Sequence, residues 1–222
     1  MKMTVLAMTL LTAILVTQNG SADTSDIEYL VIAADLSGSA SLIANDNFAR
    51  AAINRITQKI RTLKKGAYVE IKTFGDGSLD HMEPRVIRIS SRGASPDYVA
   101  NLVASTLNEI RTEVGGGQSS TNLLGFLEVE NLHCDTGSTE VLIVSDAIES
   151  SEDVSATELL NGSVFLPEPD AALLSGCRVE IIGLGNVSSG LLPRDQRKNL
   201  ETAWNTWFDA AGADEFVITY RP

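Results

Sequence analysis

The residues with the clearest chemical potential follow the first apolar run of the chain. Asp35, Ser37 and Ser39 stand at alternate positions in the segment DLSGS, directly after YLVIAA. One turn with this spacing can aim a carboxylate and two hydroxyls at a single point. Such a turn suits a metal site, a nucleophile loop or a phosphate loop, and in isolation it is equally typical of a helix cap or an ordinary turn. The strands and helices that surround the turn are needed to choose among these alternatives.

Strand patterns and helix patterns alternate along nearly the whole chain. Apolar or alternating runs predict strands at 29–35, 67–74, 85–90, 139–146, 177–185 and 215–220. Apolar residues at helical spacing predict helices at 45–63, 95–114, 121–134 and 193–213. We therefore expect an α/β fold with a doubly wound, mainly parallel sheet, one antiparallel edge strand and helices on both faces. The connection 147–176 is expected to be mostly irregular.

The direction of each element brings distant polar residues to one edge of the predicted sheet. The carboxyl ends of parallel strands meet at the same edge. The first apolar strand ends in Asp35, the strand 139–146 ends in Asp146, and the Gly-rich loop before Thr121 follows a helix that climbs to this edge. Carboxylate and hydroxyl oxygens suit Mg²⁺, Mn²⁺ or Ca²⁺ rather than Zn²⁺. Two carboxylates at one point also repel each other unless a cation lies between them.

These three segments, in this order, resemble a von Willebrand factor type A domain with a metal-ion-dependent adhesion site. That family carries Asp-x-Ser-x-Ser after the first strand, a distant Thr in a Gly-rich loop and an Asp after the fourth strand. The chain offers DLSGS, GGGQSSTNLL and VLIVSDAIES, and the resemblance extends over residues 27–220. It implies a Rossmann-like fold. The metal site that it implies consists of Asp35, Ser37, Ser39, Thr121 and Asp146.

The resemblance also implies a role for each residue. The hydroxyls of Ser37, Ser39 and, in some states, Thr121 coordinate Mg²⁺, Mn²⁺ or Ca²⁺ directly, and the two aspartates act mostly through bound water. The chain departs from the family pattern at two places. Ala147 stands where many members have Gly. Three glycines precede the Thr-containing segment, so Ser119 or Ser120 could take the place of Thr121.

The function that the resemblance implies is binding rather than catalysis. An exposed Asp or Glu of a protein partner completes the coordination of the cation, and the surrounding loops select the partner. The alternatives are a metal-dependent hydrolase or phosphotransferase, and a structural envelope module with a stabilising metal. An enzyme needs a base or a nucleophile beside the ion. The histidines, His81 and His133, are poor candidates, because His81 falls in a loop and His133 is expected at the opposite edge.

The net charge and the first residues of the chain restrict its possible partners and its location in the cell. The formal net charge of −12 disfavours nucleic acid and anionic lipid as main partners. Residues 1–22 have the layout of a secretory signal peptide, with an apolar run at 5–16 that is too short to span a bilayer. We therefore expect a single domain at 23–222, in a periplasmic or secreted protein of bacterial type without stable membrane insertion.

Two cysteines, Cys134 and Cys177, remain in the expected mature chain. An even pair in an exported protein suggests a disulfide, although two unrelated buried thiols would have the same pattern. In the family that the chain resembles, the strands 139–146 and 177–183 are neighbours. This arrangement implies that the two sulfurs come within reach at the edge opposite the metal.

Two further groups of residues receive structural interpretations. The aromatic residues Trp204, Trp207 and Phe208 are expected to form the buried face of the last helix rather than a ligand site. The acidic residues Glu149, Glu152 and Asp153 are expected to belong to a solvated loop after the metal edge.

Overall fold

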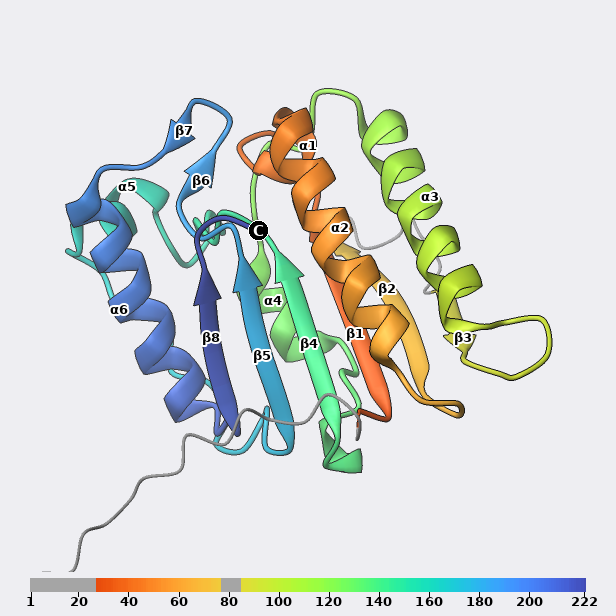
Figure 1. The fold of residues 1–222 in the computed structure, drawn as a ribbon. Coiled ribbons are helices and arrows are strands. Elements are labelled where there is room, and N and C mark those ends of the chain that lie inside the picture. Colours follow the sequence, from red (N-terminus) through yellow and green to blue (C-terminus); the bar gives the residue numbers. More distant parts are fainter. Residues whose placement is uncertain (1–26, 77–84) are drawn as a thin grey trace, which may run out of the picture.

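The computed structural model describes residues 27–76 and 85–222. The predicted signal peptide and His81 lie outside these residues. One six-stranded sheet organises the fold, in the order β3-β2-β1-β4-β5-β8 (Figure 1). Its strands are β1 (Tyr29–Asp35), β2 (Tyr68–Phe74), β3 (Arg85–Arg88), β4 (Thr139–Val144), β5 (Cys177–Ile182) and β8 (Glu215–Thr219). The edge strand β3 pairs antiparallel with β2 and all other pairs are parallel, which confirms the predicted fold class.

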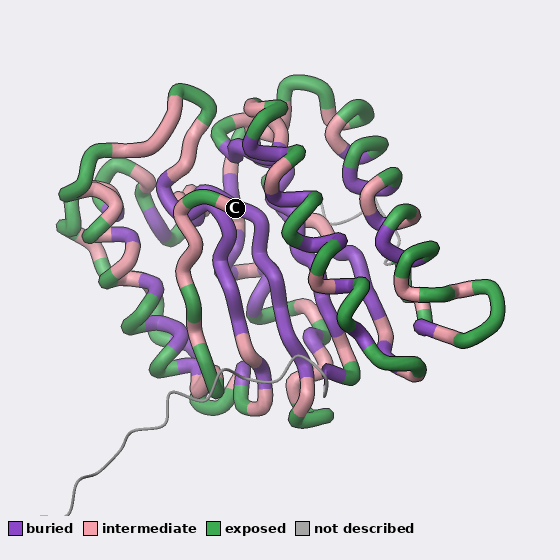
Figure 2. The backbone as a smooth tube through the Cα atoms, viewed as in Figure 1, coloured by how far each residue is buried: buried purple, intermediate pink, exposed green. Residues whose placement is uncertain are grey.

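Helices cover both faces of the sheet. They are α1 (Ser41–Ala44), α2 (Asp46–Thr62), α3 (Pro96–Val114), α4 (Leu123–Val129), α5 (Ala156–Asn161) and α6 (Arg194–Ala210). Alternate residues of β1 point to opposite faces. Leu30 and Ile32 pack in the core beneath α2 and α3, whereas Val31 and Ala33 pack with α4 and α6. The strands are therefore buried from both sides, as Figure 2 shows for the centre of the sheet.

Local sequence explains where the longer helices begin. The Asn45 side chain accepts hydrogen bonds from the N–H groups of Asn47 and Phe48 and so caps α2. Ser95 caps α3 in the same way, by accepting from Tyr98, and proline occupies the first turn. These caps satisfy backbone donors that have no partner within a helix.

The expected helix 121–134 is wrong in length. α4 ends at Val129, because Glu130 is already extended. The Asn131 side chain then accepts a hydrogen bond from the N–H of His133, which has a left-handed φ of 58°. An Asx turn of this kind competes with helix. The connection 147–176 contains the unpredicted helix α5, and a short hairpin of β6 (Asn186–Val187) and β7 (Gly190–Leu191) was also not predicted.

The aromatic residues of α6 lie in the core, as expected. Trp204 and Phe208 are completely buried and Trp207 is nearly so. Their rings pack against one another with centroids 5.1–5.9 Å apart. No helix among the described residues is long and apolar enough to cross a bilayer.

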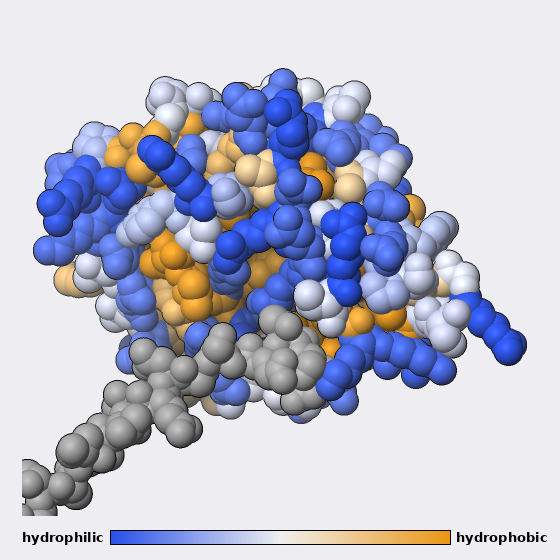
Figure 3. Space-filling view, in the orientation of Figure 1, coloured by the Kyte–Doolittle hydropathy of each residue, from blue (hydrophilic) through white to orange (hydrophobic). Residues whose placement is uncertain are grey.

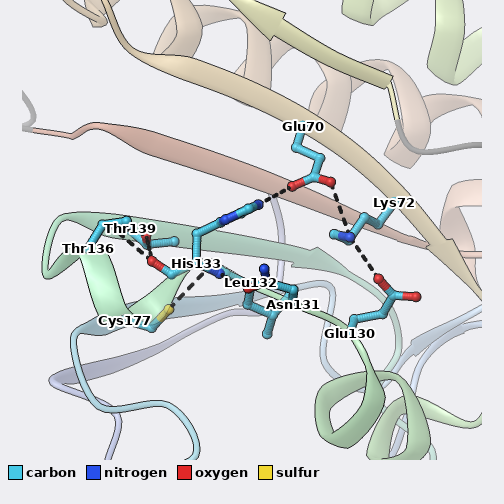
Figure 4. Close-up of polar contacts among 9 residues, drawn as sticks. All are labelled: Glu70, Lys72, Glu130, Asn131, Leu132, His133, Thr136, Thr139 and Cys177. Atoms are coloured by element: carbon cyan, nitrogen blue, oxygen red, sulfur yellow. Dashed lines mark hydrogen bonds and ion pairs between the residues drawn. The ribbon is translucent and has the colours of Figure 1, made fainter.

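A disulfide and a charged network lie at the amino-terminal edge of the sheet. Cys134 is bonded to Cys177, the first residue of β5, with their Cα atoms 4.8 Å apart. Beside it, Glu70 accepts from Lys72 at 3.1 Å and lies 3.0 Å from the His133 ring, while Lys72 also binds Glu130 at 2.7 Å (Figure 4). His133 stacks on the ring of the first residue of β1, so it lies at the edge opposite Asp35, as expected.

Candidate metal centre

The chain reverses its winding direction between β1 and β4. From β1 the chain moves outward to β2 and β3, then returns to β4 on the other side of β1. In open α/β sheets, ligands bind in the crevice outside the carboxyl ends at such a switch point. Asp35 closes β1, and the level register of Ala34 with Val144 brings the segment that carries Asp146 beside it. The topology thus places the two aspartates together.

Asp35 is fully buried, and both of its carboxylate oxygens are already hydrogen bonded. Oδ1 accepts from the N–H of Ser37 at 2.8 Å. Oδ2 accepts from the hydroxyl of Ser145 at 2.5 Å, and this hydroxyl accepts from the N–H of Ala147 at 2.8 Å. Ser145 was not predicted, although its position one residue before Asp146 was visible in the sequence. With both oxygens engaged, Asp35 fits a role that acts through water better than direct coordination.

The two hydroxyls of DLSGS lie on one side of the turn. Ser37 Oγ and Ser39 Oγ are 3.3 Å apart. Ser37 is buried and Ser39 is exposed. The pair therefore reaches from the interior to the surface, which is the arrangement that an accessible cation site needs.

Asp146 retains one unused oxygen. Oδ1 accepts from the N–H of Ile148 at 3.0 Å. Oδ2 is buried and accepts no hydrogen bond from the described residues. Burial raises the pKa of Asp146, whereas the N–H of Ile148 and the nearby hydroxyl of Ser39 lower it. A buried carboxylate oxygen without a partner is costly, and Glu149 Oε1 is a second such atom among the described residues.

The charge of Asp146 acts on Asp35. Burial, and then the charge of Asp146, raise the pKa of Asp35 to about 7, against the opposing effect of its hydrogen bonds with Ser145 and Ser37. A cation between two carboxylates removes their repulsion and favours their charged forms.

The Gly-rich loop is held against DLSGS by main-chain hydrogen bonds. The Gln118 N–H donates to the Leu36 carbonyl at 2.8 Å, and its carbonyl accepts from Gly38 at 2.9 Å. Gly117 has a φ of 83°, and a Cβ on it would lie 2.3 Å from the Cα of Gly38. Only glycine permits this conformation and this approach. The loop is thus joined to the segment that follows the first strand.

Thr121 is the most enclosed of the three candidate hydroxyls in this loop. Thr121 is 2 % exposed, whereas Ser120 is half-buried and Ser119 is exposed. The Thr121 carbonyl accepts from the N–H of Ser150 at 2.9 Å, which ties the loop to the segment after Asp146. The main chain therefore brings the segment of Thr121 to this edge.

The expected solvation of Glu149 is wrong. Glu149 is fully buried, and its Oε2 accepts from the N–H groups of Leu123 and Leu124 at 2.8 and 3.1 Å. These donors open α4 and have no partner within the helix, so a carboxylate is a suitable acceptor. Burial raises the pKa of Glu149. Its neighbours Glu152 and Asp153 are exposed, as expected.

Glu149 and Ser150 together bind the Asp146 segment to the Thr121 loop. The sequence alone does not distinguish Glu149 from the acidic residues near it, because its role as a hydrogen-bond acceptor depends on the position of α4. Ala147 has a left-handed φ of 57°, a conformation that glycine adopts more readily than alanine. Its carbonyl accepts from the Trp204 indole N–H at 2.8 Å, which anchors the segment to α6.

The β6–β7 hairpin encloses another side of the centre. The N–H of Ser188 donates to the carbonyl of Ser39 at 3.0 Å, and the N–H of Gly185 donates to the carbonyl of Asp146 at 2.8 Å. The hairpin therefore supports both halves of the candidate site. Its segment, GLGNVSSG, resembles a dinucleotide-binding loop in sequence but here forms two short antiparallel strands.

The residues present fit a hard divalent cation. Within residues 27–76 and 85–222, no three His, Cys, Asp or Glu side chains gather in a metal-binding group. The candidate centre has only Asp35 and Asp146 as charged members, and its other oxygens are hydroxyls. Such a donor set suits Mg²⁺, Mn²⁺ or Ca²⁺, and the unused Oδ2 of Asp146 is consistent with it. Comparison of the chain with protein-family models and with curated proteins finds no match.

Proposed function

We propose that this chain is an exported, metal-dependent protein-binding module of the von Willebrand factor A type. The observation that carries the proposal is the buried pair of Asp35 and Asp146 at the switch point, with one oxygen unpartnered. Burial raises the pKa of both carboxyls and the charge of Asp146 raises that of Asp35 further, whereas only hydroxyl and N–H donors lower them. No basic side chain among the described residues compensates the pair. The pair of carboxylates therefore lacks a compensating positive charge, and a divalent cation would supply it.

The residues have distinct roles in this proposal. Ser37, Ser39 and Thr121 provide neutral hydroxyl oxygens, while Asp35 and Asp146 provide negative charge from the interior. A cation held mostly by neutral oxygens keeps much of its positive charge and attracts an exposed Asp or Glu of a protein partner. Ser39 is the exposed member and marks the side from which the partner approaches. Export to the periplasm or the medium rests on the signal-like residues 1–22 and agrees with the disulfide.

The first experiment tests the cation. A ligand that binds only the folded state stabilises it by about 2.7 kcal/mol at 100 times its Kd. Mg²⁺ or Mn²⁺ should therefore raise the melting temperature, and EDTA should remove the increment. Asp35→Ala and Asp146→Ala should abolish the increment, whereas Glu152→Ala, an exposed acid of the same segment, should retain it. An identical response in wild type and Asp146→Ala would refute the site.

The second experiment tests the binding function. The immobilised chain should retain protein partners from an envelope extract in Mg²⁺ and release them in EDTA. Ser39→Ala and Thr121→Ala should weaken this retention. If the cation raises the melting temperature but retention is the same in EDTA, the centre has only a structural role. A retained partner whose acidic residues can be neutralised without loss of binding would exclude the proposed carboxylate contact.

A further inference from the structure

The basic residues of this acidic chain are concentrated in one region. Residues 50–111 contain 11 of the 17 Lys and Arg residues and only 6 of the 29 Asp and Glu residues, a net charge of +5. The rest of the chain carries 6 basic and 23 acidic residues, a net charge of −17. This region includes most of α2 and α3, which lie side by side on one face of the sheet (Figure 1). Several of these bases form ion pairs with acids outside the region, such as Arg55 with Glu180 and Lys59 with Glu140. The positive charge that a partner of opposite sign can reach is therefore that of the exposed arginines between α2 and α3.

A polar groove of about 470 Å³ runs between α2 and α3. On α2 it is lined by Arg50, Asn54, Thr57 and Arg61, which recur at intervals of three or four residues and so share one face of the helix. Buried Thr57 and Ile53 lie lowest, whereas the arginines and Asn54 are exposed at the rim. Figure 3 shows strongly hydrophilic side chains over α2, in the centre of the view.

The facing side of α3 repeats the pattern. Asn101, Ala104, Asn108 and Arg111 line the groove at the same spacing, and the small Ala104 leaves room between the two helices. Asn101 and Asn108 are exposed, so their side-chain amides are accessible. The groove thus presents guanidinium and amide donors from both walls. Asp46, at one end, is the only acidic residue of the lining.

Existing ion pairs leave most of the donors in this groove available. Arg61 binds Asp97 at 3.2 Å, but the Asp97 side chain is 80 % exposed. Arg111 binds Asp46 at 2.7 Å, but the Arg111 side chain is only 16 % exposed and also donates to the Leu42 carbonyl. An exposed pair such as Arg61–Asp97 contributes about 0–1 kcal/mol, and a guanidinium has five N–H donors. A second carboxylate can therefore share Arg61.

Arg50 is the most available cation of the groove. The only hydrogen bond of its side chain among the described residues is a long one, 3.5 Å, to the Asn47 side chain. Arg50 and Arg61 are 11 residues apart on α2, which corresponds to about 16 Å along the helix. An extended peptide of about five residues spans this distance. The spacing matches a short segment with several acidic side chains better than a single small anion.

We propose that the α2–α3 groove is a second binding site, which receives an acidic segment of a protein in extended conformation. Arg50 and Arg61 bind its carboxylates, and Asn54, Asn101 and Asn108 donate to its carbonyl groups. This site goes beyond the proposed metal-dependent contact, because none of its donors belongs to the metal centre. Binding at the groove therefore does not require a cation.

The test uses a fluorescein-labelled octaglutamate peptide and the whole chain in EDTA. Fluorescence anisotropy at low salt should detect binding that weakens as NaCl is added, since salt screens exposed charges. The double variant Arg50→Ala/Arg61→Ala should weaken binding at least tenfold. The matched control Arg194→Ala/Lys198→Ala removes two exposed basic residues of α6 and should change affinity less than twofold. Octaglutamine should not bind.

Several outcomes would overturn the proposal. These are the absence of octaglutamate binding, equal affinity in both double variants, and loss of binding in EDTA, which would assign the peptide to the metal centre. Arginine-dependent binding of a sulfated oligosaccharide or of anionic vesicles, without octaglutamate binding, would assign the groove to another class of partner. Circular dichroism melts of each variant establish that it is folded. A failure of the metal centre, tested by melting in Mg²⁺, leaves this result unaffected.

Discussion

Buried acids in the body of the sheet have basic partners, whereas buried acids at its carboxyl edge do not, among the described residues. In the part of the chain that the structure describes, three buried glutamates on the strands each contact a base: Glu70 with Lys72, Glu140 with Lys59, and Glu180 with Arg55. Three more buried carboxylates lie at the carboxyl edge, and none forms an ion pair among the described residues. These are Asp35, Asp146 and Glu149.

This difference shows which buried charges are compensated by other groups of the same chain. A buried charge is tolerated when an opposite charge and hydrogen bonds compensate the loss of water. The strand glutamates meet this condition inside the folded chain. The acids of the carboxyl edge receive only N–H and O–H donors, and Asp146 and Glu149 each keep an oxygen without a partner among the described residues. Damage to the body should therefore affect folding, and damage to the edge should affect ligand response.

The largest effect is expected from the disulfide. Cys134 and Cys177 are 43 positions apart, and in the chain-entropy model a bridge of this length stabilises the fold by about 4 kcal/mol. Cys134→Ala/Cys177→Ala should lower the free energy of unfolding by about this amount in urea. The Mg²⁺ increment in melting temperature should persist, because the bridge lies at the edge opposite Asp35. Mass spectrometry of an unreduced digest should find the two peptides linked, and free thiols would contradict the bridge.

Lys72 gives the next largest effect. Its side chain is 7 % exposed and contacts Glu70 and Glu130, so Lys72→Met leaves Glu130 without its base and Glu70 with His133 alone. Breaking a buried pair in this way costs about 3 kcal/mol. The matched control is Arg85→Met, because Arg85 forms an exposed pair with Glu109 at 3.9 Å and one hydrogen bond to the Thr106 hydroxyl, and their loss should cost about 1 kcal/mol. Equal losses in urea denaturation would show that the Lys72 network is not a structural unit.

The smallest change in folding is expected at Asp146. Asp146→Asn removes a buried charge that has no basic partner, so without metal the free energy of unfolding should change by less than about 1 kcal/mol or increase. The same variant should lose the stabilisation by Mg²⁺. Melting curves in EDTA and in Mg²⁺ measure both effects. Destabilisation in EDTA as large as that of Lys72→Met would show that the two regions do not differ as described.

Elements with local signals could be predicted from the sequence. The Ser95 cap, the apolar spacing of α2 and the continuous apolar run of β1 each reflect contacts within a few residues. Strand direction was enough to place Asp35 and Asp146 at one edge. This inference needs only the right alternation of strands and helices, so it tolerates errors in their ends.

Other features depended on tertiary contacts and could not be predicted. Glu149 resembles the exposed acids beside it, and only the position of α4 makes it an acceptor for Leu123 and Leu124. Ser145 acquires its role because β4 lies beside β1. The sequence does contain a signal for the early end of α4, since Asn131 is a residue that favours turns. The helical spacing of the apolar residues led to the prediction of a longer helix.

The hydrogen bond from Trp204 to Ala147 gives the carboxyl edge an optical probe. The chain has two tryptophans, both on α6, and Trp204 donates to the residue directly after Asp146. A buried indole is sensitive to the partner of its N–H, so a rearrangement of the Asp146 segment changes the emission of the protein without any label. Trp207→Phe would leave Trp204 as the single fluorophore. Intrinsic fluorescence can then follow events at this edge in real time.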